Sequence, residues 1–401
     1  MFNKEELKKL LKEKNINGQS SLNEILRDLT REVIEVLYDE ELTNHLGYDK
    51  NKKSSSTNQR NGRGNKTVHS KLGSIELTPP RDRLGTFDPQ VIKKRQRDIT
   101  GIEDKVISMY SRGMSTRDIS DHIDEIYGYK LSAESISTIT DKVIERAKEW
   151  QSRPLDSVYS IVFMDGMVLK MRQDGTVQKV TVYVIIGINL EGIKSCLGLY
   201  FAKNESAKYW LTAMNELKNR GVEDILIFSV DNLTGISNAI TAAFPKSEIQ
   251  KCVVHQIRNS LKFVPWKERK IVANDLKKIY TASSADSGWD KLESFSEKWD
   301  RKYPHISKSW KSNWEELSTF FKYSDDIRRV IYTTNPIESF NRGIRKVTKT
   351  RSSFHHEDAV LKLLFLATEN IEKKWSMPIR NWGTIYSQLT IFFEERLAKY
   401  I

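Results

Sequence analysis

The 401-residue sequence contains only two cysteines and no long apolar run. Cys196 and Cys252 cannot build a disulfide framework, which excludes the small disulfide-stapled secreted proteins and favours a reducing, cytoplasmic location. No apolar segment follows the first residues, so we expect no signal peptide. The longest apolar stretch, around residues 180–188, is far shorter than the roughly 18 residues that a membrane span needs. We therefore expect no membrane association.

Acidic residues are fewer than basic ones, 53 against 65, which gives a net charge of +12 and a pI near 9.3. This balance favours a polyanionic partner such as nucleic acid over an acidic small substrate. With 38% apolar and 10% aromatic residues the chain can form hydrophobic cores. At about 100 to 200 residues per domain, the length predicts two to four domains.

Residues 1–48 are expected to be a helical segment. Their apolar side chains recur at helical spacing, which predicts an amphipathic helix that packs against a neighbour or against a second subunit. This face is a candidate dimer interface. The stripe consists of Leu22, Leu26, Leu29, Val33 and Leu37.

Residues 49–66 are expected to form a basic flexible arm. From Lys50 to Lys66 there is no apolar residue and no acid, so the segment cannot bury a core. It is either a solvated linker or an arm that contacts phosphates, for which Arg60 and Arg63 are the candidate DNA-binding residues.

Residues 67–100 are expected to contain a small hairpin and a linker. The run from Thr67 to Thr78 alternates around Gly73 and stops at Pro79 and Pro80.

Residues 101–152 are expected to fold as three successive helices. Ser115 and Asp118 have the spacing of a capping box for the second helix, which should end near Gly128, and the third helix should begin after Ser132. A short glycine-containing turn and a third helix whose outer face carries Lys142 are typical of a helix-turn-helix domain that binds DNA. Ordinary three-helix packing is the alternative.

Residues 153–264 are expected to contain a sheet in which two buried strands run directly into an acid. The run 158–164 precedes Asp165, and the run 224–230 precedes Asp231. Between them lie two more strand patterns, which predict an antiparallel meander, and a helix. If the two acid-bearing strands are parallel neighbours, both carboxylates lie at the same edge of the sheet. Each acid alone could equally be a turn residue or a helix cap.

Residues 265–332 carry five of the nine tryptophans and no strand pattern. They predict an all-helical insertion with its own aromatic core. Trp310, Trp314, Leu317 and Phe321 recur at helical spacing within it. Stacking of some of these rings on nucleic acid bases is the alternative.

Residues 333–401 are expected to complete the core and to end in helices. Asn335 as N-cap and Pro336 at the first position begin a helix, and Glu338 at the third position could close a capping box. Gly343 suggests a close approach by something bulky, such as a phosphate backbone. The helix should bury Ile337, Phe340, Ile344 and Val347 and expose Glu338, Asn341, Arg342, Arg345 and Lys349.

Three carboxylates a few ångström apart raise one another's pKa unless cations lie between them. Two divalent ions about 3.5 to 4 Å apart are the usual solution, and oxygen ligands favour Mg²⁺, with Mn²⁺ as a substitute. If Asp165, Asp231 and Glu338 come together, the site should therefore hold two Mg²⁺ ions and should cut or join nucleic acid.

Three motifs carry a family resemblance. The segments Asp231–Gly235, Cys252–His255 and Asn335–Arg342 resemble the Mutator-like transposases of bacterial insertion sequences, which have an aspartate-aspartate-glutamate site. The resemblance implies an α/β RNase H-like core, a mixed sheet with flanking helices, that is interrupted by the helical insertion and preceded by a mainly helical DNA-binding region. It also implies binding of terminal inverted repeats, metal-dependent cleavage and strand transfer, and a homodimer that joins two element ends.

The resemblance assigns the metals to Asp165, Asp231 and Glu338 and places His255 near the scissile phosphate or a metal-bound water. Cys252 with His255 could be half a zinc site, or Cys252 could be buried packing. The candidate DNA contacts near the site are Arg258, Arg342, Arg345 and Lys349. Two other functions stay open: a structure-directed nuclease on the same fold without strand transfer, and a non-catalytic DNA-binding regulator derived from a transposase.

Overall fold

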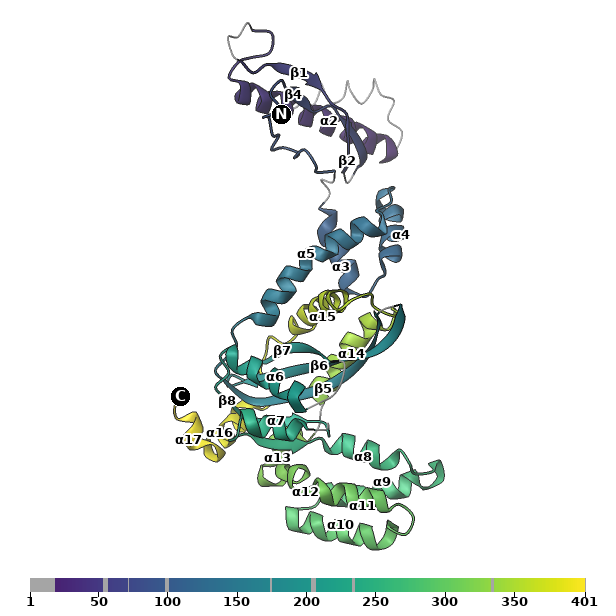
Figure 1. The fold of residues 1–401 in the computed structure, drawn as a ribbon, viewed down its shortest axis with the longest axis vertical. Helices are drawn as coiled ribbons and strands as arrows, with labels where there is room; N and C mark the ends of the chain where they lie inside the picture. The colour runs from purple at the N-terminus through teal and green to yellow at the C-terminus, as the bar shows by residue number, and fades with distance from the viewer. Residues whose placement is uncertain are drawn as a thin grey trace. The chain divides into compact units, whose positions relative to one another are not determined.

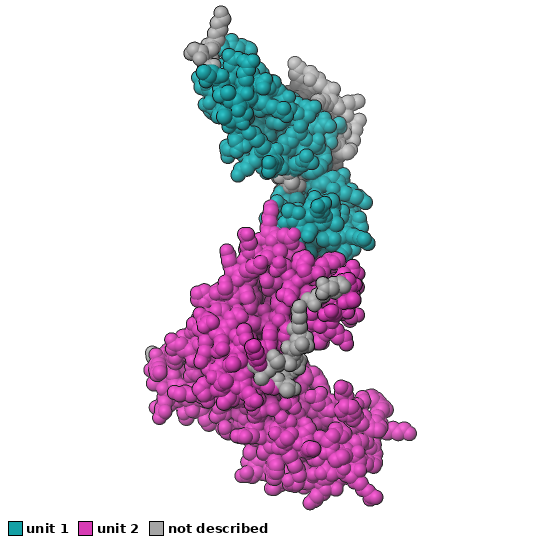
Figure 2. Space-filling model, in the orientation of Figure 1, with its two compact units in different colours: residues 1–110, 114–140 teal, residues 111–113, 141–401 magenta. Residues whose placement is uncertain are grey.

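A computed structural model describes residues 19–52, 57–70, 72–97, 101–173, 175–202, 207–232, 235–332 and 335–400. The chain divides into two compact units (Figure 2), residues 1–110 with 114–140 and residues 111–113 with 141–401. Within the described ranges, no helix has both the length and the apolar character needed to cross a membrane.

The first described element of the first unit is the long helix α2 (Gln19–Leu46), which confirms the predicted amphipathic helix. Its buried side includes Ile34 and Tyr38, which join the core formed with Val68, Ile75 and Leu77. The last three belong to the antiparallel hairpin β2 (Lys66–Ser70) and β3 (Gly73–Leu77), as predicted. Alternation along these strands sends every second side chain onto the helix.

The second half of the expected flexible arm is ordered, which corrects that prediction. Strand β1 (Arg60–Arg63) pairs with β4 (Pro80–Asp82). An Arg60 guanidinium N–H donates to Thr43 Oγ1 at 2.8 Å, and Arg63 forms an ion pair with Asp39. Side chains of α2 thus hold the basic strand, and charge pairing replaces the missing apolar residues. Residues 53–56 of the expected arm lie outside the described residues.

Three helices follow as predicted: α3 (Ile102–Ser111), α4 (Thr116–Tyr127) and α5 (Ala133–Ser152). Both hydrogen bonds of the capping box are present, with Asp118 N–H donating to Ser115 Oγ at 3.2 Å and Ser115 N–H donating to Asp118 Oδ2 at 3.1 Å. Gly128 ends α4 with a φ of 70°, the left-handed conformation that glycine adopts at least cost. The boundary between the two units falls within α5, at residues 140 and 141.

The second unit contains a five-stranded mixed sheet (Figure 1) with the order β7-β6-β5-β8-β9. Strands β5, β6 and β7 form the predicted antiparallel meander, and β8 and β9 continue the sheet parallel to β5. The strands are β5 (Val158–Gln173), β6 (Thr176–Asn189), β7 (Lys194–Ala202), β8 (Asp224–Val230) and β9 (Glu248–Lys251).

Apolar side chains cover the sheet on both faces. Val162 and Met164 of β5 belong to a core cluster with α6 (Ala207–Asn219) and α7 (Ile236–Ala243). Phe163, which points to the opposite face, is also fully buried. The helix α14 (Asn335–Thr348) contacts β5, and the helix α15 (Glu357–Glu372) contacts β7. This double coverage explains the nearly continuous apolar character of the strands.

Residues 265–332, all described, contain helices and no strand, as predicted. Trp310 is buried, and its indole N–H donates to Ser260 Oγ at 2.9 Å. The expected aromatic stripe is not on one helix, because Asn313 separates α11 from α12 and Phe321 lies on the short 3₁₀ helix that follows. The helices from β9 to α14 are α8 (Val253–Leu261), α9 (Trp266–Tyr280), α10 (Ala285–Trp299), α11 (Pro304–Ser312), α12 (Trp314–Leu317), η1 (Thr319–Lys322) and α13 (Asp325–Ile331). After α15 come α16 (Trp382–Phe392) and α17 (Glu394–Leu397).

Candidate active site

The two aspartates lie side by side because β5 and β8 are parallel neighbours. The last parallel pair is Met164 with Val230, and Asp165 and Asp231 are the next residue of each chain segment. The sequence interpretation that β5 ends at its acid is wrong. The strand continues to Gln173 as one arm of a long hairpin, so Asp165 lies within a strand at the level where β8 ends.

Asp165 has a strongly perturbed carboxyl group. Its burial, followed by the negative charge of Asp231, raises the pKa of Asp165 to about 7. Two carboxylates that share a poorly solvated site favour one neutral, protonated member unless a cation compensates for the charge. A positive charge beside the pair would therefore stabilise the ionised form of both carboxylates.

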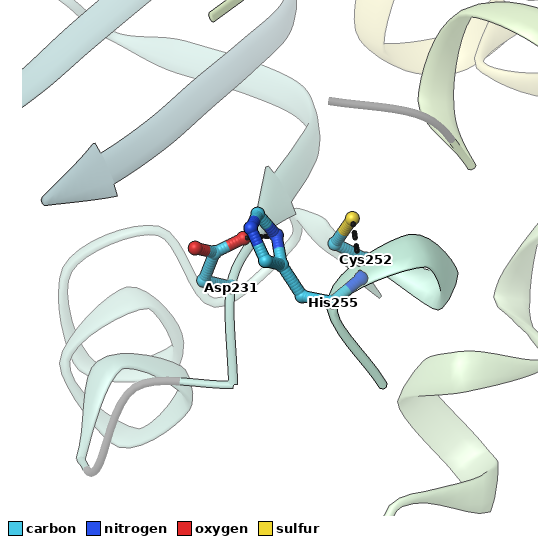
Figure 3. A group of neighbouring side chains, drawn as sticks. All are labelled: Asp231, Cys252 and His255. Carbon is cyan, nitrogen blue, oxygen red and sulfur yellow. Dashed lines mark hydrogen bonds and ion pairs between the residues drawn. The ribbon is translucent and has the colours of Figure 1, made fainter. Parts of the chain in front are cut away.

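Helix α8 brings a histidine to Asp231 (Figure 3). The Cys252 thiol caps the helix by accepting a hydrogen bond from the His255 backbone N–H at 3.4 Å, and the His255 ring forms an ion pair with Asp231 through Nδ1. The interaction with Asp231 raises the pKa of His255 to about 10, so the imidazole carries a positive charge at neutral pH. Ligand atoms of Asp231, Cys252 and His255 lie within 4.8 Å of one another.

The third acid, Glu338, lies in the first turn of α14 and faces α8. Arg258 donates to Glu338 Oε1 at 2.6 Å, and the same guanidinium nitrogen lies 3.3 Å from His255 Nε2. A continuous chain of charged groups therefore runs from Asp231 through His255 and Arg258 to Glu338. Two cations of α8 balance two of the three acids.

Asn341 is a site residue that sequence reasoning missed. It was expected on the exposed side of α14, but its side chain is only 3% exposed. Its amide Nδ2 donates to Asp165 Oδ2 at 2.5 Å, whereas its Oδ1 is buried and accepts no hydrogen bond from the described residues. The available signal was its position one helical turn after Glu338, which puts both side chains on one face.

These groups border a cavity of about 660 Å³. Arg342 and Arg345 are exposed at its edge, on the same helix as Glu338. Asp231 lies beside this cavity, in contact with His255, and the structure thus brings together the three predicted acids. The lining residues are Asp165, His255, Arg258, Glu338, Ser339, Asn341, Arg342 and Arg345.

The remaining predicted DNA-binding residues lie elsewhere. Lys349 is exposed just after the end of α14, and Lys142 is exposed on α5. Arg60 and Arg63 take part in the contacts to α2 described above.

Two glycines lie against packed side chains, and for Gly343 this differs from the expectation. A Cβ at Gly343 would lie 2.8 Å from Ile371 Cδ1 of α15, so the close neighbour of Gly343 is a packed helix and not a phosphate backbone. A Cβ at Gly166 would lie 2.9 Å from the Tyr183 ring on β6. Both glycines therefore permit close packing beneath the site.

Comparisons with known proteins show the family of the chain. The family model "Transposase, Mutator family" matches residues 1–378. A probable transposase for the insertion sequence element ISRM3-like from Sinorhizobium fredii is 43% identical over 93% of this chain and 93% of its own. The transposase for ISRM3 from Rhizobium meliloti is equally similar, and a probable insertion sequence transposase from Corynebacterium diphtheriae is 37% identical over 80% of this chain and 100% of its own. The chain belongs to the Mutator family of insertion sequence transposases.

Proposed function

We propose that this transposase cuts and joins DNA at a metal site formed by Asp165, Asp231 and Glu338 in an RNase H-like core. The parallel register of β5 and β8 carries the proposal, because it sets two carboxylates at one sheet edge with β9 continuing in the same direction. The substrates would be the terminal inverted repeats of the element and a target DNA. The helices α9 to α13 would be an insertion into this core.

The donor set fits magnesium or manganese. Carboxylate oxygens are ligands that hard divalent cations prefer, and the raised pKa of Asp165 is what a cation would reverse. Held by Asp165, Asp231 and Glu338, two such ions would supply activation of an attacking water or 3′-hydroxyl and stabilisation of the leaving oxygen of a phosphodiester.

The side chains around the acids would position and neutralise the reacting groups. Asn341 would hold the Asp165 carboxylate in one orientation. His255, charged and paired with Asp231, would lie near the scissile phosphate and stabilise its developing negative charge. Arg258 would restrain Glu338 until DNA arrives.

The exposed cations next to the cavity would bind the DNA backbone. Arg342 and Arg345 border the cavity, and Lys349 directly follows the last residue of the same helix. Arginine recognises phosphate through paired N–H donors, which suits positions beside a scissile bond. The three-helix segment, with Lys142 on α5, would contact the element end.

Strand cleavage by charge-removing variants tests the metal site. Asp165→Asn, Asp231→Asn and Glu338→Gln should each lose cleavage of a labelled element end in Mg²⁺ while retaining DNA binding. Wild-type cleavage by any of the three would contradict the assignment. The surface control is Lys302→Gln in the helical segment. The Lys302 side chain is exposed and pairs with Glu268.

Strand transfer separates the proposed activity from hydrolysis alone. The protein, a pre-cut end with a free 3′-hydroxyl and a target plasmid should give joined products in Mg²⁺ or Mn²⁺. Nicked plasmid without joined products would identify a nuclease, and no strand breakage under any condition would identify a DNA-binding regulator.

The same proposal includes a homodimer. Leu26, Val33 and Leu37 of α2 are exposed, although the opposite side of the helix is buried in the first unit. The side chain of Leu22 lies outside the described residues. An apolar helical face of this kind suits a second copy, and light scattering of Val33→Glu should show a shift from dimer to monomer.

A further inference from the structure

The first unit has a second basic surface, separate from the candidate active site. A cleft of about 680 Å³ is lined mainly by strand β2, strand β4 and the segment that follows to residue 97. Four cationic side chains, from Lys66, Arg81, Lys94 and Arg97, line this cleft. We refer to these four residues as the cleft cations.

The acid that lines the cleft does not neutralise the cleft cations. Asp82 is the acid that lines the cleft, and it is 4% exposed. Its carboxylate accepts hydrogen bonds from Asn58, from Thr86 and from the Phe87 backbone N–H. Its charge is therefore already engaged inside the fold.

Three acids of α2 are also paired with groups outside the cleft. Asp39 pairs with Arg63, and Glu35 accepts from Thr78. Glu41 accepts hydrogen bonds from two backbone N–H groups, those of residues 90 and 91. These contacts fix the helix to the β hairpins and leave the cleft with a positive balance.

Local packing holds two of the cleft cations in position. The Arg81 guanidinium lies across Gly64, where an added Cβ would be only 2.5 Å from Nη2. Lys66 donates to the Lys93 carbonyl at 2.6 Å. Burial and the nearby charge of Arg97 lower the pKa of Lys66, as expected for cations that face one another.

We propose that this cleft binds the phosphodiester backbone of double-stranded DNA, as a contact additional to the three-helix segment and the catalytic site. The inference rests on the proposed function, because it takes DNA as the substrate. Four cations distributed over a cleft of this volume exceed what a single phosphate needs. Its aromatic residues Tyr38 and Phe87 are buried, so it offers charge and not a stacking surface for single-stranded bases.

The salt dependence of DNA binding tests the inference on the full-length protein. Arg81, Lys94 and Arg97 are exposed, so their combined substitution, R81Q with K94Q and R97Q, should leave the fold intact. The slope of log K against log salt should become shallower by about 0.9 for each phosphate that the variant no longer neutralises. Because phosphates carry no sequence information, affinity should fall equally for an inverted-repeat duplex and an unrelated duplex.

A matched triple variant controls for net charge. Arg83, Lys93 and Arg95 are exposed residues of the same unit that do not line the cleft. The triple substitution R83Q, K93Q and R95Q should keep a slope close to that of the wild type. Equal reductions of the slope in both triple variants, or a wild-type slope in the cleft variant, would overturn the inference. Gly64→Ala, which should displace the Arg81 guanidinium at constant charge, should make the slope shallower by about 0.9.

Cleavage assays distinguish this inference from the proposed function. If the wild type cleaves and joins DNA while the cleft variant keeps its slope, the inference fails and the function stands. If the wild type binds no duplex at any salt concentration, both fail. As an independent readout, bound duplex should protect Lys94 from amine acylation but leave Lys302 of the second unit reactive.

Discussion

Asn341 donates a hydrogen bond to Asp165 across the junction of α14 and β5, at 2.5 Å between Nδ2 and Oδ2. Two segments separated by 176 positions thus share one buried polar contact. The contact fixes the orientation of a carboxylate whose pKa is raised to about 7. It also explains why a polar residue occurs on the buried side of α14.

Asn341→Ala should therefore reduce strand cleavage about 10- to 100-fold, because a hydrogen bond to a charged group contributes about 1.5 to 3 kcal/mol. The measurement is single-turnover cleavage of a bound DNA end across a Mg²⁺ titration, which should show a weakened metal response. Asn274→Ala, an exposed substitution of the same type on α9, is the control. Unchanged cleavage in Asn341→Ala would remove Asn341 from the site.

His255→Gln should shift the acid limb of the cleavage pH profile to higher pH. The charge of His255 lowers the pKa of Asp165, so its removal raises that pKa and the carboxylate forms only at higher pH. The measurement is the cleavage rate from pH 6 to 9 at subsaturating Mg²⁺, where protons compete with the metal for Asp165. If the cleavage rate falls at every pH and the acid limb stays at the same pH, His255 does not act through the charge of Asp165.

Gly343→Ala should destabilise the second unit through its contact with α15. The added methyl group would lie 2.8 Å from Ile371 Cδ1, an overpacking that costs about 1 to 3 kcal/mol, partly offset by the roughly 1 kcal/mol that alanine gains over glycine in a helix. Ile371→Val removes the clashing atom. In denaturant unfolding, Gly343→Ala should therefore be neutral or stabilising in the Ile371→Val background, and additive destabilisation would contradict this packing.

Asp82→Asn should destabilise the first unit at neutral pH. Burial by itself raises the pKa of Asp82. The hydrogen bonds from Asn58, Thr86 and the Phe87 backbone have the larger combined effect and hold that pKa well below its usual range. The charged form therefore stabilises the fold above the unfolded pKa of about 3.9, and this stability is lost as pH falls toward the folded pKa. Amide exchange at Thr86 and Phe87 should be faster in the variant at pH 7, and the difference in unfolding free energy should narrow below pH 4. A constant difference at all pH values would show that the charge is not involved.

Local patterns along the sequence determined most of the elements. The spacing of apolar residues predicted α2, the meander and β8, and the Ser115–Asp118 capping box predicted the start of α4. These features depend on neighbours within a few residues, which a sequence displays directly. The three acids also followed from local context, since each one comes after a buried strand or near the start of a helix.

Only the tertiary structure decided which side chains meet. Arg60 and Arg63 have the appearance of a solvated arm until α2 supplies Thr43 and Asp39 as partners. Asn341 is placed on a polar face by periodicity but is buried by β5, and Gly343 is crowded by α15 and not by a ligand. The amino-acid sequence by itself determined the elements and the chemical character of the site, because both are properties of short segments. The pairing of Asp165 with Asp231, and the His255 and Arg258 cations beside them, required parallel strands and a helix brought together from distant parts of the chain.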